Sequence, residues 1–221
     1  MKWTIPNCLT VLRLLAAPGV VVMFLYFHRP WADWFALTLF VGAAITDYFD
    51  GYLARLWKQE SKFGAMLDPI ADKAMVVIAI MVITGYNGMN AWLILPATVI
   101  LFREVFVSGL REYLGARAGL LSVTKLAKWK TTAQMVAIAV LFLGTGLEYL
   151  NGVAMQGMTL EQYSEAVAAG LADPIRACGK RDCASLANDA GFVLLWFAAI
   201  LTFLTGWDYF RKALPLLKDD A

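Results

Sequence analysis

Four aspartates that could bind a metal ion together lie in the N-terminal half of the chain, within otherwise apolar segments. Asp47 and Asp50 are three residues apart, and Asp68 and Asp72 are four residues apart. On a helix, residues at either spacing share one face, so each pair directs two carboxylates the same way. A carboxylate near the centre of a membrane helix costs about 2.5–3.5 kcal/mol, so four of them need a compensating cation. Hard oxygen ligands of this kind suit Mg²⁺, Mn²⁺ or Ca²⁺.

The polar stretch between the two pairs contains Gly64, where we expect the chain to turn back. Two antiparallel helices would then direct both pairs of carboxylates to one point. Such a cluster can hold two metal ions roughly 3.5–4 Å apart, an arrangement that neutralises a diphosphate and orients an attacking hydroxyl. The alternative is that the four side chains only extend to a membrane surface, which leaves their spacing and the neighbouring glycines unexplained.

The segment from the first to the last of these aspartates resembles a family signature. The CDP-alcohol phosphotransferases carry the pattern D-x2-D-G-x2-A-R-x8-G-x3-D-x3-D. Every defined position is filled here, by Asp47, Asp50, Gly51, Ala54, Arg55, Gly64, Asp68 and Asp72. The resemblance implies a reaction in which an alcohol attacks the lipid-side phosphate of a CDP-linked donor, and CMP leaves.

The resemblance also implies a role for each residue of the motif. Asp47, Asp50 and Asp68 would bind the metal, expected as two ions of Mg²⁺ or Mn²⁺. Asp72 would be the general base and a further metal ligand, and neighbouring cations would keep its carboxylate ionised. We expect the CDP-linked donor to be bound by Asn7, Thr10, Gly51, Ala54, Arg55 and Gly64.

The chemistry of these residue types supports the assignments. Gly51 lets a nucleotide approach the helix backbone closely. Arg55, four residues later on the same face, can pair with a phosphate. In the first apolar segment, Asn7, Thr10 and Arg13 share one face of the predicted helix.

A later segment, FREVFVSGLREYL at residues 102–114, indicates which alcohol is used. It places Arg103 and Arg111 eight residues apart, about two helical turns, so they share a face. This phrase resembles the phosphatidylglycerophosphate-forming branch of the family, in which CDP-diacylglycerol is the donor and glycerol 3-phosphate the acceptor.

The segment 122–135 resembles the same branch and adds Lys125, Lys128 and Lys130. A phosphorylated acceptor needs a cationic pocket, and guanidinium groups bind phosphate through two parallel hydrogen bonds. The other interpretation is that these residues contact lipid headgroups on the cytoplasmic side. We expect the acceptor phosphate to be bound by Arg103, Arg111 and Lys128.

The composition predicts an all-α, polytopic membrane protein. The 221 residues are 60% hydrophobic and 16% charged, with a mean hydropathy of +0.63. We expect one domain over residues 1–221, with six transmembrane helices around a cytoplasm-facing polar cavity. Each predicted span is close to the roughly 20 residues that cross a bilayer. The spans are 9–27, 34–56, 67–86, 91–113, 129–150 and 190–211.

Residues 151–189 are too polar to span a membrane and are expected to form an extracytoplasmic loop. Cys178 and Cys183 lie in this loop, where they could form a disulfide or remain free thiols.

Basic residues set the expected orientation. Most of the 19 lysines and arginines fall on one side of the predicted spans. The positive-inside rule therefore places both termini and the aspartates in the cytoplasm, and the family resemblance implies a bacterial inner membrane. The acyl chains of the substrates would stay among the membrane lipids. The family resemblance implies a homodimer. No basic patch interleaved with aromatic residues is present, so we expect no nucleic-acid partner.

Other functions remain open from these residues. The aspartate motif alone does not separate glycerol 3-phosphate from inositol phosphate, serine or phosphatidylglycerol as the acceptor. Carboxylates within a membrane can also mark the ion path of a cation transporter. The acids gather at one membrane face, however, and no repeat or broken-helix symmetry is visible. A non-catalytic lipid-binding scaffold would need no base at Asp72.

Overall fold

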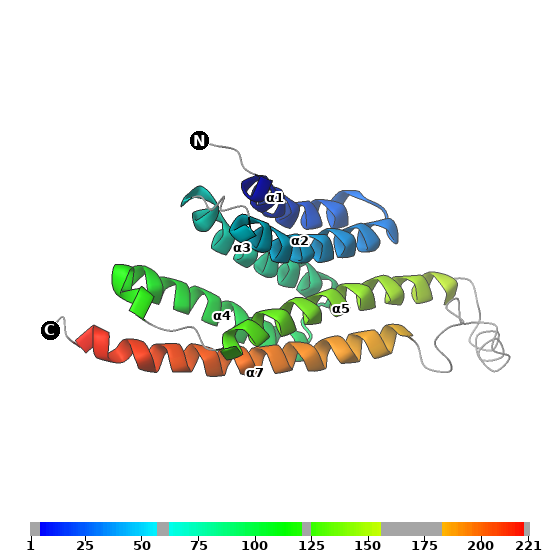
Figure 1. Cartoon of the computed structure of the whole chain (residues 1–221). Helices are drawn as coiled ribbons and strands as arrows, with labels where there is room; N and C mark the ends of the chain where they lie inside the picture. The colour runs from blue at the N-terminus through cyan, green and yellow to red at the C-terminus, as the bar shows by residue number, and fades with distance from the viewer. Residues whose placement is uncertain (1–4, 57–61, 121–124, 156–182, 219–221) are drawn as a thin grey trace. The chain divides into compact units, whose positions relative to one another are not determined.

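The computed structural model of the chain describes residues 5–56, 62–120, 125–155 and 183–218. Within these ranges the chain forms long α-helices and one short 3₁₀ helix, and no strand (Figure 1). The all-α prediction is therefore confirmed for the described residues. The elements are α1 (Ile5–Tyr26), α2 (Trp31–Leu56), α3 (Lys62–Asn87), α4 (Ala91–Leu114), η1 (Gly115–Leu120), α5 (Lys125–Met155) and α7 (Cys183–Lys218).

Two helices extend into the segment that was predicted to be an extracytoplasmic loop. α5 continues to Met155 and α7 begins at Cys183, so both reach into the segment predicted as a loop. Polar residues restrict which part of a helix can lie in lipid, but they need not end the helix. A helix can therefore continue beyond the part that spans the membrane. The rest of the predicted loop lies outside the described residues, and because it includes Cys178, the choice between a Cys178–Cys183 disulfide and free thiols is not tested.

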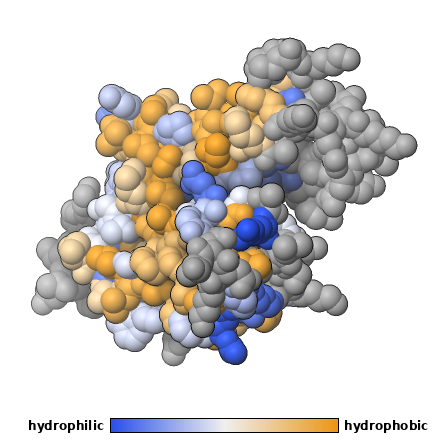
Figure 2. All heavy atoms as spheres, turned by 90° about the vertical axis from the view of Figure 1, so that its left-hand side faces the viewer, coloured by the Kyte–Doolittle hydropathy of each residue, from blue (hydrophilic) through white to orange (hydrophobic). Residues whose placement is uncertain are grey.

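The helices are those of a membrane protein. In the described part of the chain, four segments are long and apolar enough to cross a bilayer: Asn7–Tyr26, Ala91–Leu114, Trp129–Leu150 and Ala184–Leu217. Large apolar side chains are exposed along them, and Figure 2 shows apolar residues over much of the face that it displays. Lipid-facing surfaces have this character. The two further spans expected in α2 and α3 stay predictions.

The chain divides into two compact units. The first consists of Met1–Tyr86 and Ile138–Gly191, and the second of Asn87–Ala137 and Phe192–Ala221. The first unit therefore contains α1, α2, α3 and the C-terminal part of α5. The second contains α4, η1, the N-terminal part of α5 and most of α7. Whether the chain is one functional domain, as expected, stays a prediction.

Small buried residues let the helices of the first unit approach one another closely. Ala17 of α1 and Ala32 and Ala36 of α2 are completely buried. Small side chains of this kind favour tight helix packing in membranes. Aromatic rings fill the centre of the unit, where Phe142 of α5 packs against Phe24 and Phe40 at centroid distances of 5.9 and 5.6 Å.

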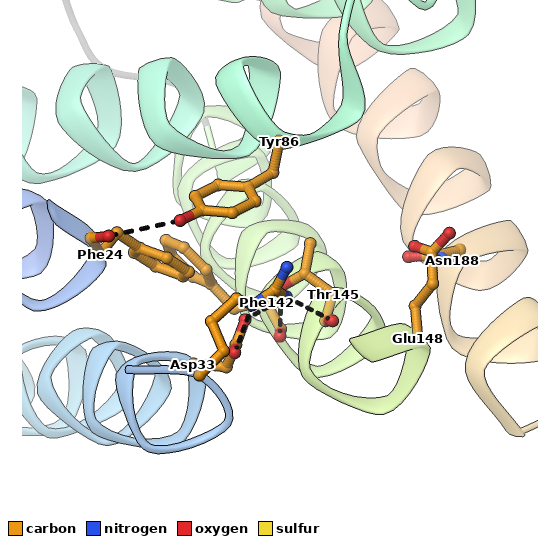
Figure 3. Close-up of polar contacts among 8 residues, drawn as sticks. Phe24, Asp33, Tyr86, Phe142, Thr145, Glu148 and Asn188 are labelled. Atoms are coloured by element: carbon orange, nitrogen blue, oxygen red, sulfur yellow. Dashed lines mark hydrogen bonds and ion pairs between the residues drawn. The ribbon is translucent and has the colours of Figure 1, made fainter. Parts of the chain in front are cut away.

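A buried ion pair fixes one end of this unit (Figure 3). Arg29 donates two hydrogen bonds to Asp33, at 2.8 and 2.6 Å, and a third to the carbonyl oxygen of Thr145 at 2.8 Å. Its guanidinium also lies over the rings of Tyr86 and Tyr149, 4.8 and 4.5 Å from their centroids. These contacts connect the start of α2 to the end of α3 and to α5.

Candidate active site

The first helix contacts the aspartates of both motif helices. Nη1 of Arg13 lies 2.6 Å from Oδ1 of Asp47 on α2 and 3.1 Å from Oδ1 of Asp72 on α3. The side chain of Arg13 is 1% exposed, whereas those of Asp47 and Asp72 are 41% and 40% exposed. The two carboxylates therefore touch a buried guanidinium and keep an accessible side.

One turn earlier on α1, Thr10 contacts a third aspartate. Its hydroxyl donates a hydrogen bond of 2.7 Å to Oδ1 of Asp68. Asn7, a further turn back, is buried on the same helix, as is Thr10. The face of α1 that carries Asn7, Thr10 and Arg13 is thus a polar surface turned toward the motif, and the predicted shared face is confirmed.

The other motif residues are only partly described. Asp50, Gly51, Ala54 and Arg55 lie in the last turns of α2, and their side chains are outside the description. Gly64 is buried in the first turn of α3. The expectation that Gly64 forms the turn between the two helices is therefore wrong, because the helical conformation already begins at residue 62. The predicted binding roles of these residues stay predictions.

The described carboxylates fit a divalent cation. Their donors are hard oxygen atoms, and Asp47 and Asp72 already share one positively charged group, the guanidinium of Arg13. Among side chains that the structure describes, which leaves out Asp50, no three acidic groups are grouped closely enough to share one ion. The fit to a divalent cation therefore rests on the hard oxygen donors and on the guanidinium of Arg13 that Asp47 and Asp72 share.

The predicted acceptor residues belong to the second unit, where a carboxylate holds two cationic side chains. Glu104 of α4 forms an ion pair with Lys130 of α5. It forms a second ion pair with Arg103, whose Nη1 lies 3.4 Å from Oε1 of Glu104. Arg103, Glu104 and Lys130 are each less than one-fifth exposed. Arg103 is therefore mostly covered by protein in this cluster, and its predicted role at the acceptor phosphate stays a prediction.

Arg111 differs from Arg103 in its surroundings. Arg111 is exposed, and its guanidinium lies over the ring of Tyr209 on α7, 5.2 Å from the centroid. The side chain of Lys128 is outside the description. Lys130, which the sequence did not single out as a pocket residue, is the lysine that the structure buries beside Glu104.

Sequence reasoning also left Arg13 without a role. Its position on the same face as Asn7 and Thr10 was the available signal, but its partners are 34 or more residues away in the sequence. Only the packing of α1 on α2 and α3 identifies them.

Comparison with known proteins gives concordant results. Residues 3–172 match the family model described as CDP-alcohol phosphatidyltransferase. A protein of Cereibacter sphaeroides is 79% identical over the full length of both chains, and its name is CDP-diacylglycerol–glycerol-3-phosphate 3-phosphatidyltransferase. A protein of Shigella flexneri with the same name is 40% identical, over 78% of this chain and all of its own length.

A relative of that name from Salmonella choleraesuis is 45% identical over 63% of this chain and 76% of its own. The match to the family model covers α1 to α5, and so includes the complete aspartate motif and the polar face of α1. The chain belongs to the CDP-alcohol phosphatidyltransferase family.

Proposed function

We propose that this chain transfers the phosphatidyl group of CDP-diacylglycerol to a hydroxyl of glycerol 3-phosphate, giving phosphatidylglycerophosphate and CMP. The observation that carries this proposal is the 79% identity, over the full length, to a relative named for that reaction. The filled aspartate motif and the polar face of α1 support the same chemistry.

The family generally uses a divalent metal. We propose two ions, Mg²⁺ or Mn²⁺, held by Asp47, Asp50, Asp68 and Asp72. Bound there, a divalent ion supplies positive charge that neutralises the diphosphate and the departing CMP. The carboxylates of Asp47 and Asp72 each keep an accessible side, through which such an ion could reach them from solution.

Asp72 is proposed as the general base. The hydroxyl oxygen of glycerol 3-phosphate forms a bond to the lipid-side phosphorus, and the bond from that phosphorus to the bridging oxygen breaks. The hydroxyl proton passes to the carboxylate of Asp72, and CMP leaves with the bridging oxygen. One oxygen of Asp72 contacts Arg13, and the side chain keeps 40% of its surface accessible for this step.

Binding of the two substrates is assigned to separate groups of residues. The CDP-linked donor is assigned to Asn7, Thr10, Gly51, Ala54, Arg55 and Gly64. The acceptor phosphate is assigned to Arg103, Arg111 and Lys128, whose charges suit a dianion. The burial of Arg103 beside Glu104 supports this assignment, because a buried arginine is held in place before the phosphate arrives.

The proposal includes the setting of the enzyme. The relatives are bacterial, which supports a location in the inner membrane. Six spans, a cavity that opens to the cytoplasm, cytoplasmic termini and a homodimer complete the proposed arrangement.

Release of CMP by purified protein tests the proposed acceptor. CDP-diacylglycerol and Mg²⁺ are supplied with glycerol 3-phosphate, inositol phosphate, serine or phosphatidylglycerol in parallel. Release with glycerol 3-phosphate alone supports the whole assignment. Release with only one of the other alcohols would keep the role of the aspartates and refute the assignment of Arg103, Arg111 and Lys128.

A further inference from the structure

Arg13 is a charged residue at an unusual place in α1. It lies in an apolar helix that is long enough to cross a membrane, and its side chain is 1% exposed. A buried guanidinium is unfavourable unless carboxylates or other acceptors surround it. Here two carboxylates from two different helices meet it, Asp47 from α2 and Asp72 from α3.

Arg13 contacts the carboxylates, but its burial keeps it from contacting the substrate. Arg13 touches both carboxylates through Nη1 and is covered by protein, whereas Asp47 and Asp72 each keep about two-fifths of their surface accessible. A group in this position can act on the carboxylates, but the protein around it keeps it from a phosphate in solution. In this respect it differs from Arg55, which the motif assigns to the CDP-linked donor.

We propose that Arg13 is a positioning residue of the aspartate site: it holds the carboxylates of Asp47 and Asp72 in the arrangement that binds the divalent ion. The inference rests on the proposed function and adds to it a residue outside the aspartate motif. Residues that hold metal ligands in place contribute strongly to binding, and their loss typically lowers metal affinity or activity by about 10- to 100-fold.

Electrostatics gives the physical reason. Two carboxylates that approach one point repel each other, so without a fixed positive charge they separate or one becomes protonated. Arg13 offsets this repulsion before any metal arrives, and its planar guanidinium limits the rotation of both side chains. Thr10 makes the corresponding contact to Asp68, so among the described side chains one face of α1 contacts Asp47, Asp68 and Asp72.

The test is the affinity of purified protein for Mn²⁺, followed by the loss of the electron paramagnetic resonance signal of free Mn²⁺. Arg13→Gln removes the charge and is expected to weaken binding by about 10- to 100-fold. Arg13→Lys keeps the charge and is expected to retain more affinity than the Gln variant. Arg211→Gln removes an exposed arginine of α7 and is expected to bind Mn²⁺ like the unaltered protein.

Kinetics separate positioning from substrate binding. In the Arg13 variants, the Mn²⁺ concentration for half-maximal CMP release should rise, while the KM for CDP-diacylglycerol at saturating metal should stay within about twofold. A main effect on that KM would instead mean that Arg13 binds the donor, which would overturn the proposal. If Arg13→Gln does not fold, the Mn²⁺ affinity and the kinetics of CMP release are both measured with Arg13→Lys.

A double-mutant cycle shows whether Arg13 acts through its carboxylate partners. In a protein that carries Asp47→Asn, adding Arg13→Gln should weaken Mn²⁺ binding by less than it does in the unaltered protein. Unchanged or tighter Mn²⁺ binding by Arg13→Gln alone would overturn the inference. Failure of the unaltered protein to bind Mn²⁺ or to release CMP would instead refute the proposed function.

Discussion

Lys130 of α5 forms an ion pair with Glu104 of α4, and both side chains are largely buried. Glu104 also contacts Arg103, so one carboxylate neutralises part of the charge of two cations. Removing one partner of such a pair leaves charge buried without compensation, which typically destabilises a protein by about 3–5 kcal/mol.

Glu104→Ala is therefore expected to lower the free energy of unfolding by about 3 kcal/mol. Thermal denaturation of the detergent-solubilised protein measures the change. Glu112→Ala, an exposed glutamate on the same helix, serves as the matched control and should unfold at nearly the same temperature as the unaltered protein. Equal melting temperatures of Glu104→Ala and Glu112→Ala would show that the ion pair between Glu104 and Lys130 contributes nothing to the free energy of unfolding.

Gly206 of α7 provides a way to move Arg103 without replacing it. A Cβ atom at Gly206 would lie 2.8 Å from Cγ of Arg103, too close for the arginine to keep its position. Gly206→Ala should raise the KM for glycerol 3-phosphate about tenfold, the effect of weakening one charge-assisted hydrogen bond by about 1.4 kcal/mol. Kinetics with varied acceptor and saturating CDP-diacylglycerol measure it.

Gly109→Ala is the control for this substitution, because a Cβ atom there would meet nothing within 4 Å. Its KM should not change. If Gly206→Ala also leaves the KM unchanged while the protein folds, Arg103 does not bind the acceptor phosphate.

Asp72→Asn removes the proposed base and keeps the size of the side chain. Because general bases contribute typically about 10²- to 10⁴-fold, turnover should fall by that factor. Binding of CDP-diacylglycerol should be largely retained, since the donor is assigned to other residues. Asp208→Asn, which alters a partly exposed ion pair with Lys212 on α7, should keep normal turnover. Normal turnover of Asp72→Asn would exclude the role of Asp72 and favour a lipid-binding scaffold.

Arg29 and Asp33 give a prediction about stability alone. Asp33 is 1% exposed, and Arg29 is its ion-pair partner and also a donor to the carbonyl oxygen of Thr145. Arg29→Ala leaves the buried carboxylate without its partner and should cost about 3 kcal/mol or more. Thermal denaturation should show the loss, while the KM for both substrates stays normal in the folded protein. A raised KM for either substrate, or a normal melting temperature, would contradict this assignment.

Several features of the fold and site follow directly from the sequence. The sequence predicted that Asp47 and Asp72 lie on helices. Each has a second aspartate three or four residues away, and this spacing places two carboxylates on one face only if the segment is helical. The apolar composition likewise predicted long membrane helices. These features depend on local spacing and composition, which one sequence contains.

Other features depend on packing between distant segments. That Arg13 meets Asp47 and Asp72 follows from how α1 lies on two other helices, and no spacing within α1 encodes it. The ion pair of Lys130 with Glu104 is of the same kind, because its two residues lie 26 positions apart on different helices. Which side of α5 faces Glu104 is decided only when the helices pack.

The formation of the lipid product tests the central claim most directly. Purified protein is incubated with CDP-diacylglycerol, Mg²⁺ and isotopically labelled glycerol 3-phosphate, and the lipid phase is analysed by mass spectrometry. We expect labelled phosphatidylglycerophosphate in amounts equal to the CMP released, and none when CDP-diacylglycerol or the metal is left out. CMP release without label in the lipid phase would contradict transfer to glycerol 3-phosphate.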